Sequence, residues 1–410
     1  MINEDPIGII ELGNINLKCL ICKIDNENKL QILSSSSTQS DGIHNGVVLN
    51  LAKASNAIRL CVSEAEKKAV ISIKKIHIVL EQPEFLCTKL SKDRKINGSK
   101  ISKEDIEFLL KEGKKQVTLN DHKQSIIHIF NHNYIVDGKI FIEEPINVFA
   151  DYLKHEMTFI TMPKNNIKNI TEAFNNCDID VDRFISCIFV LAIKLIKEDE
   201  LHSGSMIIDI GYEKISIGMF KNLALVHSIT LPVGVNHFIK DLAKVSSLNI
   251  EESKKIISEI DFSFENKKNN IFDSKNHLKE MYFTKSNYRK ISKDLIFDIV
   301  KARMDEICQL IAKQMIFTGF NKKIGVTINL VGGGSNLENI DEYFSKFFKV
   351  NVKKIKNDKT NSKNLEENFI PCLGAIKLIE DGWETEAIPE GVGKDTQKIG
   401  FFAKIFGNKQ

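Results

Sequence analysis

Residues 206–220 read MIIDIGYEKISIGMF, which is an apolar strand, a tight turn and a second apolar strand. The run Met206–Ile208 is typical of a buried strand, and Asp209-Ile210-Gly211 opens the turn. Apolar residues then alternate along the returning strand at Ile215, Ile217 and Met219. The stretch therefore predicts a β-hairpin whose turn carries a carboxylate and a glycine.

The same plan recurs near the N-terminus, where residues 8–21 read GIIELGNINLKCLI. Here Glu11-Leu12-Gly13 replaces Asp209-Ile210-Gly211, and Ile15, Leu17 and Cys19 alternate. Two such hairpins suggest two related halves, each pointing one turn at a shared cleft. In that cleft, glycine lets backbone N–H groups approach an anion. Such turns are common, so either hairpin taken alone favours the alternative of two unrelated hairpins.

A third element lies in residues 326–340, VTINLVGGGSNLENI. A β-branched strand runs into Gly332-Gly333-Gly334-Ser335 and then into the start of a helix. Backbone at such glycines can approach a nucleotide, and a helix N-terminus favours a negative group. The spacing is not that of a Walker loop or of the dinucleotide fingerprint. Two hairpins followed by a glycine strand predict the actin-like ATPase fold.

The composition fits a globular protein of two or more domains. The chain has 410 residues, 42% of them hydrophobic and 27% charged. A net charge of +3 is too small to indicate nucleic-acid binding. The eight cysteines are scattered, which favours small core residues over a metal site. The polar start MINEDP lacks a signal peptide, and the apolar run 185–193 is too short to span a bilayer, so we expect a soluble cytoplasmic protein.

Periodicity predicts the remaining elements. Helical patterns cover residues 49–69, 102–115, 165–175, 181–198, 235–245, 249–260, 296–317 and 369–381. Strand patterns cover residues 71–80, 124–130, 134–136 and 156–161. The polar stretch 84–161 indicates an α+β subdomain inserted into the first half, and the Lys/Asn-rich stretch 264–286 an exposed loop or hairpin. The helix over 181–198 is apolar on most sides, so we expect it to be buried.

These pieces, in this order, resemble FtsA, the family of actin-like division proteins that tether the tubulin-like FtsZ ring to the bacterial membrane. Residues 42–69 are similar to the family's Gly-Ile-x-x-Gly … Ala-Glu segment. Residues 130–149 are similar to its Asp-Gly … Pro-x-Gly-Met stretch, although the Gly-Met is absent here. The resemblance covers nearly the whole chain, and its strength is the full set of pieces rather than any one motif.

The resemblance implies two ribonuclease-H-like α/β halves with an FtsA-type, SHS2-like insert. The expected division is 1–82 and 162–200 for the first core subdomain, 83–161 for the insert, 201–235 and 307–385 for the second core subdomain, 236–306 for the small second-half subdomain, 386–397 for a linker and 398–410 for an amphipathic membrane helix.

Both turns depart from the family pattern. The family's first turn is Asp-x-Gly-Thr/Ser, whereas this chain has Glu11-Leu12-Gly13-Asn14. The second is Asp-Ile-Gly-Gly-Gly-Thr followed by another Asp, whereas here Asp209-Ile210-Gly211 leads into Tyr212-Glu213-Lys214, with Ser216 at the later position. Losing two glycines removes permissive backbone and places an anion where phosphates should lie, which Lys214 would partly offset. We therefore expect an adaptor with at most weak ATP hydrolysis rather than an enzyme.

The resemblance also assigns candidate ligands of ATP. Glu252 and Lys255 match the family's Glu-x-x-Lys, which lies against adenine and ribose, whereas their spacing alone favours an ordinary solvated helix face. The expected nucleotide-binding residues are Glu11, Gly13, Asn14, Asp209, Gly211, Lys214, Glu252, Lys255, Gly332, Gly333, Gly334 and Ser335. Glu11 and Asp209 would hold Mg²⁺ through water.

The C-terminal segment KIGFFAKIF, residues 398–406, suits insertion at an anionic lipid surface. The apolar residues that would enter the membrane are Ile399, Phe401, Phe402, Ile405 and Phe406, with Lys398 and Lys404 beside them. Gly400 weakens such a helix by about 1 kcal/mol relative to Ala. A frayed tail or a helix docked on the protein itself is the alternative, against which the Pro/Gly linker argues. Self-association into filaments would strengthen the weak binding of one copy.

By resemblance, the small second-half subdomain holds the C-terminal peptide of FtsZ. Arg289, Lys290, Lys293 and Arg303 would meet an acidic peptide there, although a solvated Lys-rich surface is an equal alternative. The implied location is the cytoplasmic side of the inner membrane at the division site, among other division proteins and without nucleic acid. Two rival functions are a PilM-type scaffold of pilus assembly and an active actin-like ATPase or sugar kinase.

Overall fold

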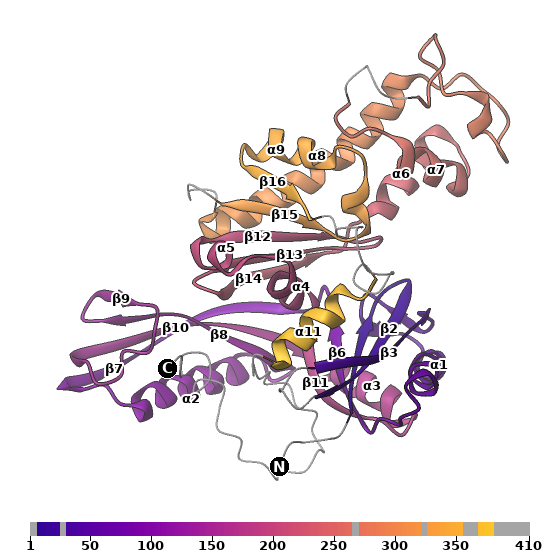
Figure 1. The fold of residues 1–410 in the computed structure, drawn as a ribbon. Coiled ribbons are helices and arrows are strands. Elements are labelled where there is room, and N and C mark those ends of the chain that lie inside the picture. Colours follow the sequence, from indigo (N-terminus) through magenta and orange to yellow (C-terminus); the bar gives the residue numbers. More distant parts are fainter. Residues whose placement is uncertain (1–5, 25–29, 265–269, 321–325, 356–367, 381–410) are drawn as a thin grey trace. The chain divides into compact units, whose positions relative to one another are not determined.

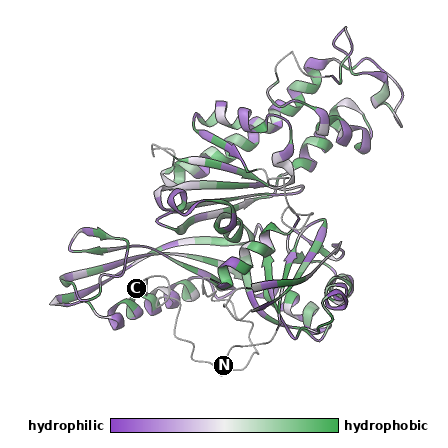
Figure 2. Cartoon of the chain, in the orientation of Figure 1, coloured by the Kyte–Doolittle hydropathy of each residue, from purple (hydrophilic) through white to green (hydrophobic). Residues whose placement is uncertain are grey.

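The computed structural model describes residues 6–24, 30–264, 270–320, 326–355 and 368–380. The chain forms two compact units (Figure 1). The first comprises residues 1–203, 218–230 and 357–410, and the second comprises residues 204–217 and 231–356. Hydrophobic residues line the strands and helices of both units (Figure 2).

The first unit is built on a five-stranded sheet with the order β11-β6-β1-β2-β3. Its strands are β1 (Ile7–Leu12), β2 (Asn16–Ile24), β3 (Leu30–Gln39), β6 (Lys75–Leu80) and β11 (Asp180–Ser186). β1, β2 and β3 form an antiparallel meander, and β6 and β11 run parallel to β1. The meander begins with the predicted first hairpin, which is confirmed.

Helices of the first unit pack in pairs. α1 packs on β2, β3 and α3, and α11 packs on α4, β1 and β2. The bounds are α1 (Leu51–Ala69), α3 (Lys164–Asn175), α4 (Cys187–Leu195), α5 (Glu198–Ser203) and α11 (Ile370–Glu380), with the short strands β4 (Ile43–His44) and β5 (Val47–Val48) before α1.

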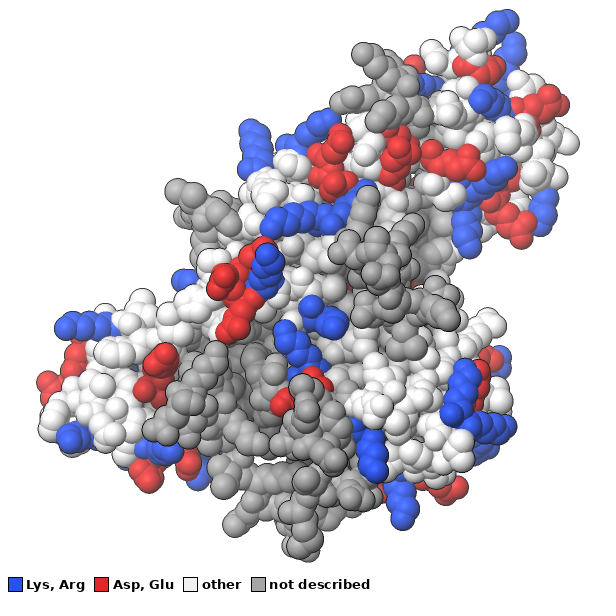
Figure 3. All heavy atoms as spheres, viewed as in Figure 1, with Lys and Arg blue, Asp and Glu red and all other residues white. Residues whose placement is uncertain are grey.

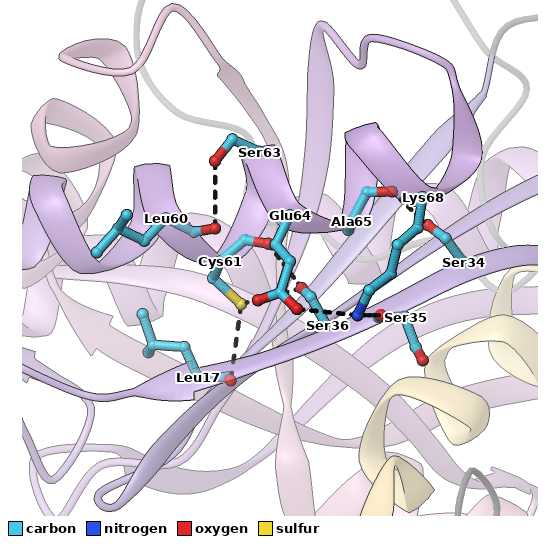
Figure 4. A network of polar contacts seen from close by, with 10 residues as sticks. All are labelled: Leu17, Ser34, Ser35, Ser36, Leu60, Cys61, Ser63, Glu64, Ala65 and Lys68. Atoms are coloured by element: carbon cyan, nitrogen blue, oxygen red, sulfur yellow. Dashed lines mark hydrogen bonds and ion pairs between the residues drawn. The ribbon is translucent and has the colours of Figure 1, made fainter.

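Serine hydroxyls of the edge strand β3 hold α1 (Figure 4). Ser34 Oγ donates to the Ala65 carbonyl (2.7 Å), and Ser36 Oγ donates to the Cys61 carbonyl (2.6 Å). Lys68 adds a hydrogen bond from its ammonium group to the Ser35 carbonyl (3.0 Å). The small side chains let helix and strand approach closely, and their buried hydroxyls find acceptors on the helix backbone. Two of the four consecutive serines thus join the strand to the helix through their hydroxyls.

The insert is a four-stranded antiparallel sheet, β7-β10-β8-β9, with one helix packed against it. Its elements are β7 (Leu86–Lys100), α2 (Lys103–Asn120), β8 (Gln124–Val136), β9 (Lys139–Phe141) and β10 (Phe149–Pro163). Ser102 and Asp105 form a capping box that begins α2. Apolar residues from α2 and the sheet share two core clusters, so the insert has a hydrophobic core of its own.

A buried histidine connects the insert to the sheet of the first unit. The backbone N–H of Ser186, where β11 ends, donates to His128 Nε2 on β8 (2.9 Å). Burial lowers the pKa of His128 to about 3. His128 is therefore neutral at physiological pH, and Nε2 keeps the lone pair that accepts this hydrogen bond.

The second five-stranded sheet has the order β14-β13-β12-β15-β16. Its strands are β12 (Ser205–Ile210), β13 (Ile215–Lys221), β14 (Ala224–Leu231), β15 (Thr327–Val331) and β16 (Asn351–Lys354). When the strands of each five-stranded sheet are numbered along the chain, both sheets have the spatial order 3-2-1-4-5. This common plan confirms the predicted pair of ribonuclease-H-like halves.

The helices of the second unit include three that pack together, since α6 packs against both α7 and α8. Their bounds are α6 (Val235–Ser246), α7 (Ile250–Glu259), η1 (Glu280–Tyr282), α8 (Lys293–Thr318), η3 (Gly333–Asn336) and α9 (Ile340–Phe348). Basic and acidic side chains are interspersed over the face drawn in Figure 3, in keeping with the small net charge.

Several predicted elements are wrong. Residues 181–198 are not one helix, because 180–186 form β11, which pairs with β6, before α4 begins at Cys187. An apolar run is compatible with both a buried strand and a buried helix, and here pairing with β6 decided the outcome. The strands expected at 124–130 and 134–136 are one strand, β8. The described part of 264–286 is irregular with an antiparallel bridge between Phe272 and Leu278, as expected of a loop or hairpin, but Ile271, Leu278 and Tyr282 are buried rather than exposed.

Candidate functional site

The turn of the second hairpin is joined to the start of α6 through backbone hydrogen bonds. Gly211 N donates to the Lys214 carbonyl (2.9 Å), which closes the turn. The carbonyls of Gly211 and Tyr212 then accept the N–H groups of Val235 (3.1 Å) and Asn236 (2.8 Å). A Cβ on Gly234 would lie 2.6 Å from both carbonyl oxygens, so only glycine permits this approach.

Side chains complete this junction. Asn236 Nδ2 donates to Glu213 Oε1 (2.7 Å), which holds the Glu213 carboxylate beside the helix start. His237 Nδ1 accepts the Gly234 N–H (3.1 Å), and the His237 N–H donates to the Gly234 carbonyl (3.0 Å). The backbone N–H groups of residues 234–237 therefore all have acceptors within the chain. An incoming phosphate would find these donors occupied and a carboxylate nearby.

The glycine strand meets the end of β12. Gly332 has φ +83°, and a Cβ there would overlap Asp209 Oδ1 and lie 2.8 Å from the Ile210 carbonyl oxygen. Gly333, in contrast, has open space where a Cβ would lie. Buried Ser335 donates through Oγ to the Gly332 carbonyl (2.7 Å). The structure thus brings Asp209 and the glycine run together, as the sequence predicts for one side of a nucleotide site. The helix expected directly after the glycines is instead the short turn η3, and α9 begins only at Ile340.

The first turn uses its polar groups internally. Lys18 Nζ lies 3.3 Å from Glu11 Oε2, and although burial opposes the charged form, the Glu11 carboxylate raises the pKa of Lys18. Asn14 Nδ2 donates to Asn45 Oδ1 (2.6 Å), while Asn45 N donates to Asn14 Oδ1 (2.6 Å). A Cβ on Gly13 would lie 2.5 Å from the carbonyl oxygen of Asn16, three residues later. In the second turn, a Cβ on Gly211 would lie 2.8 Å from the carbonyl oxygen of Lys214, also three residues later. The two turns share one backbone shape.

The predicted magnesium ligands belong to different units. Glu11 lies in the first unit and pairs with Lys18, whereas Asp209 lies in the second unit and packs against Gly332. Within the described ranges, no three His, Cys, Asp or Glu side chains are grouped closely enough to hold a metal ion. Of the three consecutive glycines only Gly333 has open space beside it, and the second turn does not suit phosphate.

Glu252 on α7 anchors a neighbouring loop. Its carboxylate accepts the N–H groups of Asn249 (2.8 Å), Lys285 (2.6 Å) and Ser286 (2.8 Å) and the Ser286 hydroxyl (2.6 Å). Burial opposes the charged form, but these hydrogen bonds outweigh it and lower the pKa of Glu252 to about 2. Lys255 Nζ lies 5.0 Å from the ring centroid of Tyr282. Both residues of the predicted Glu-x-x-Lys pair therefore face the segment 280–286.

The four cations expected to meet an acidic peptide have different environments. Arg303 binds Asp241, and Arg289 donates to the Ser246 carbonyl. Lys293 is buried, with Nζ 5.1 Å from the ring centroid of Phe297. Lys290 is exposed. Three of the four are thus engaged inside the second unit.

The residues assigned to membrane insertion lie outside the described part of the chain. They are Lys398, Ile399, Phe401, Phe402, Lys404, Ile405 and Phe406, and the predicted linker 386–397 also lies outside it. Among the helices that the structure describes, none combines the length and the apolar character needed to cross a bilayer.

Sequence reasoning missed the junction of the second turn with α6. The sequence did show a helix opening after Leu231-Pro232-Val233-Gly234. It carried no signal that the carbonyls of residues 211 and 212 would cap that helix, or that Asn236 would bind Glu213. The strands β13 and β14 separate these partners in the sequence.

Comparison with known proteins matches the second half and the insert to two models of one family. The family model for cell division protein FtsA matches residues 206–369, and the model for the SHS2 domain inserted in FtsA matches residues 86–161. Together the two matches cover more than half of the chain. They agree with the order of pieces expected from the sequence.

Relatives extend the similarity over most of the chain. Cell division protein FtsA of Buchnera aphidicola subsp. Schizaphis graminum is 26% identical over 363 residues, which are 86% of this chain and 84% of that protein. FtsA of Buchnera aphidicola subsp. Acyrthosiphon pisum is 24% identical over 97% of this chain and 94% of its own length. A chain of the PilM-PilN type IV pilus biogenesis complex shares the fold with a TM-score of 0.61 at 12% identity, over 93% of this chain and 98% of that chain. The predicted actin-like fold with an SHS2 insert is confirmed.

The glycine run offers a matched pair of substitutions. Gly332→Ala should destabilise the second unit by about 2 kcal/mol or more, because its positive φ and the Asp209 carboxylate exclude a Cβ. Gly333→Ala should change stability by less than about 0.5 kcal/mol, since open space surrounds that position. Urea denaturation followed by circular dichroism measures both effects. Equal losses for the two variants would contradict the packing described here.

Glu252 predicts a pH-dependent contribution to stability. Its folded-state pKa of about 2 lies below the usual 4.5, so the stabilisation is fully present above pH 4.5 and disappears as the pH falls toward 2. Glu252→Gln should cost about 1–3 kcal/mol at neutral pH, because a charged acceptor of four hydrogen bonds is lost. The difference from the wild type should shrink between pH 4.5 and 2.

The neighbouring exposed Glu251, which pairs with Lys285, is the control for this measurement. Glu251→Gln should cost less than about 1 kcal/mol, as for other exposed ion pairs. Urea denaturation at a series of pH values gives both differences. A Glu252→Gln deficit that stayed constant down to pH 2 would show that the carboxylate charge is not what holds the loop.

Proposed function

Since this chain belongs to the FtsA family of cell division proteins, we propose that it holds FtsZ filaments at the cytoplasmic face of the inner membrane during division. The observation that carries the proposal is that family matches to both the FtsA body and its inserted SHS2 domain fall on one chain in the family's order. We further propose that copies of the chain associate into filaments and recruit other division proteins.

Membrane attachment is assigned to residues 398–406 on the basis of sequence. The apolar side chains of this segment would enter the lipid, while Lys398 and Lys404 would meet anionic headgroups. A segment with so few apolar anchors binds weakly as one copy. Assembly on a filament multiplies the contacts and makes attachment stable.

Nucleotide is proposed to set conformation and assembly rather than to drive turnover. Gly333, with open space beside it, offers close backbone approach on the side that would take adenosine. The second turn disfavours phosphate, because Glu213 is held beside α6 and the N–H groups there are already bonded. No hydrolytic step is assigned to any residue.

A PilM-type scaffold remains the second candidate because of the shared fold. At 12% identity that likeness concerns the fold alone, and it does not assign pilus assembly to this chain. The matches to FtsA and to its insert favour the division adaptor. Binding to FtsZ separates the two functions.

Vesicle sedimentation tests the adaptor function. Vesicles containing phosphatidylglycerol are mixed with FtsZ filaments and either the full chain or a version ending at Glu386. The full chain should carry FtsZ into the vesicle pellet, and the shortened chain should leave it in solution, because the apolar anchors are lost.

A vesicle-free sedimentation of FtsZ filaments with the shortened chain is the control, since FtsZ binding should persist without the tail. If the full chain and the shortened chain behave alike on vesicles, the tail is not the anchor. If neither binds filaments, the pilus-type scaffold becomes the better function.

Replacing Tyr212 and Glu213 by the glycines of the family pattern tests the effect of the second turn on nucleotide affinity. The double variant Tyr212→Gly, Glu213→Gly should bind a fluorescent ATP analogue at least about fivefold tighter than the wild type, since a like charge at about 4 Å costs about 1 kcal/mol even in water. Glu213→Gln removes the charge but keeps a side chain that can bind Asn236. It therefore distinguishes the effect of the charge on nucleotide affinity from the effect of backbone freedom. Equal affinity for all three proteins would show that the turn does not oppose phosphate.

A further inference from the structure

A carboxylate from the turn of the second hairpin lies at the start of α6. Glu213 Oε1 accepts a hydrogen bond from Asn236 Nδ2 (2.7 Å), although the two residues lie 23 positions apart in the chain. Asn236 is buried and Glu213 is half-buried, so the contact is partly withdrawn from water. The first turn of α6 reads Val-Asn-His-Phe and has no acidic residue of its own. Glu213 therefore supplies negative charge that this helix lacks.

Negative charge at a helix start is favourable. A helix begins with N–H groups that lack partners within the helix, and its N-terminus carries a partial positive charge. In α2, α7 and α9 the first turn contains two acidic residues that meet this need locally. α6 instead obtains its carboxylate from the turn of the second hairpin, whose carbonyls at Gly211 and Tyr212 also accept two of its first N–H groups.

The glycine run meets the same junction. A Cβ on Gly334 would lie 2.8 Å from Val235 Cγ2, on the first residue of α6, and 2.9 Å from the Ile210 carbonyl oxygen. The segment proposed to approach a nucleotide therefore packs directly on the turn and on the helix start. Glu213 is an anion already present there, and a phosphate brought to this junction would meet a like charge.

We infer that Glu213 is a built-in substitute for phosphate, which supplies the negative charge at the start of α6 and positions Asn236. The second unit thereby completes the junction of turn, helix and glycine run without a bound anion. The inference rests on the proposed function, because it concerns the proposed nucleotide site. It adds that a nucleotide acts on the second unit through its nucleoside, while its phosphates contribute no affinity.

Thermal unfolding of the full chain with an added anion tests the inference. Glu213→Ala should lower the unfolding midpoint by about 2–4 °C, because a hydrogen bond to a charged acceptor is lost. Sodium pyrophosphate should then raise the midpoint of Glu213→Ala by at least about 1 °C more than that of the wild type. The reason is that the freed Asn236 amide and the helix start can take an anion from solution.

Asp298→Ala is the matched control, since it removes one negative charge from α8 near Val245, toward the other end of α6. Its midpoint should respond to pyrophosphate as that of the wild type does. Equal midpoints of the wild type and Glu213→Ala without added anion, or equal responses of these two proteins to pyrophosphate, would overturn the inference.

ATP and adenosine give a second measurement on the wild type. ATP should raise the unfolding midpoint no more than adenosine does at the same concentration, because Glu213 opposes the phosphates. A larger shift with ATP would also overturn the inference. If neither compound shifts the midpoint, the proposed role of nucleotide fails, whereas the role of Glu213 is decided by Glu213→Ala. Sedimentation of FtsZ with vesicles tests the adaptor function separately.

Discussion

The second unit depends on how closely the backbone at the end of β12 approaches its neighbours. Carbonyls of residues 211 and 212 accept the first N–H groups of α6, and the Asp209 carboxylate packs against the backbone of Gly332. Both contacts need glycine, at 234 and at 332, because any Cβ would overlap the groups that meet there. The hairpin, the glycine strand and α6 therefore form one packed assembly.

Much of the fold was predictable because its signals are local. Alternating apolar residues marked both hairpins, and the glycine run marked the end of β15. β11 was missed because the stretch 181–198, which is apolar on most sides, fits a buried strand as well as a helix, and only the pairing of its first part with β6 distinguishes them. The insert was recognisable from its change in composition, but of its three long strands β7 was not predicted, and β8 and β10 were underestimated in length.

The site was less predictable, because charged residues acquired partners far away in the sequence. Arg303 binds Asp241 on another helix, and Glu252 gathers N–H groups from residues 285 and 286. Spacing along a helix identifies residues that share a face but does not reveal what packs on that face. The resemblance assigned both Asp209 and the glycines to the nucleotide site, and the parallel pairing of β12 with β15 explains why they meet.

The serines of β3 have a geometric consequence for α1. Ser34 and Ser36 are two residues apart on a strand, about 6.6 Å, and their acceptors Ala65 and Cys61 are four residues apart on a helix, about 6 Å. The two spacings nearly coincide, so both hydroxyls can reach their carbonyls at the same time. Sliding the helix by one residue would disengage both bonds, whereas sliding by a full turn would engage them again. These two hydroxyls therefore help to fix the register of α1 on β3, and an insertion between β3 and α1 keeps that register only when the connecting loop absorbs the added residues.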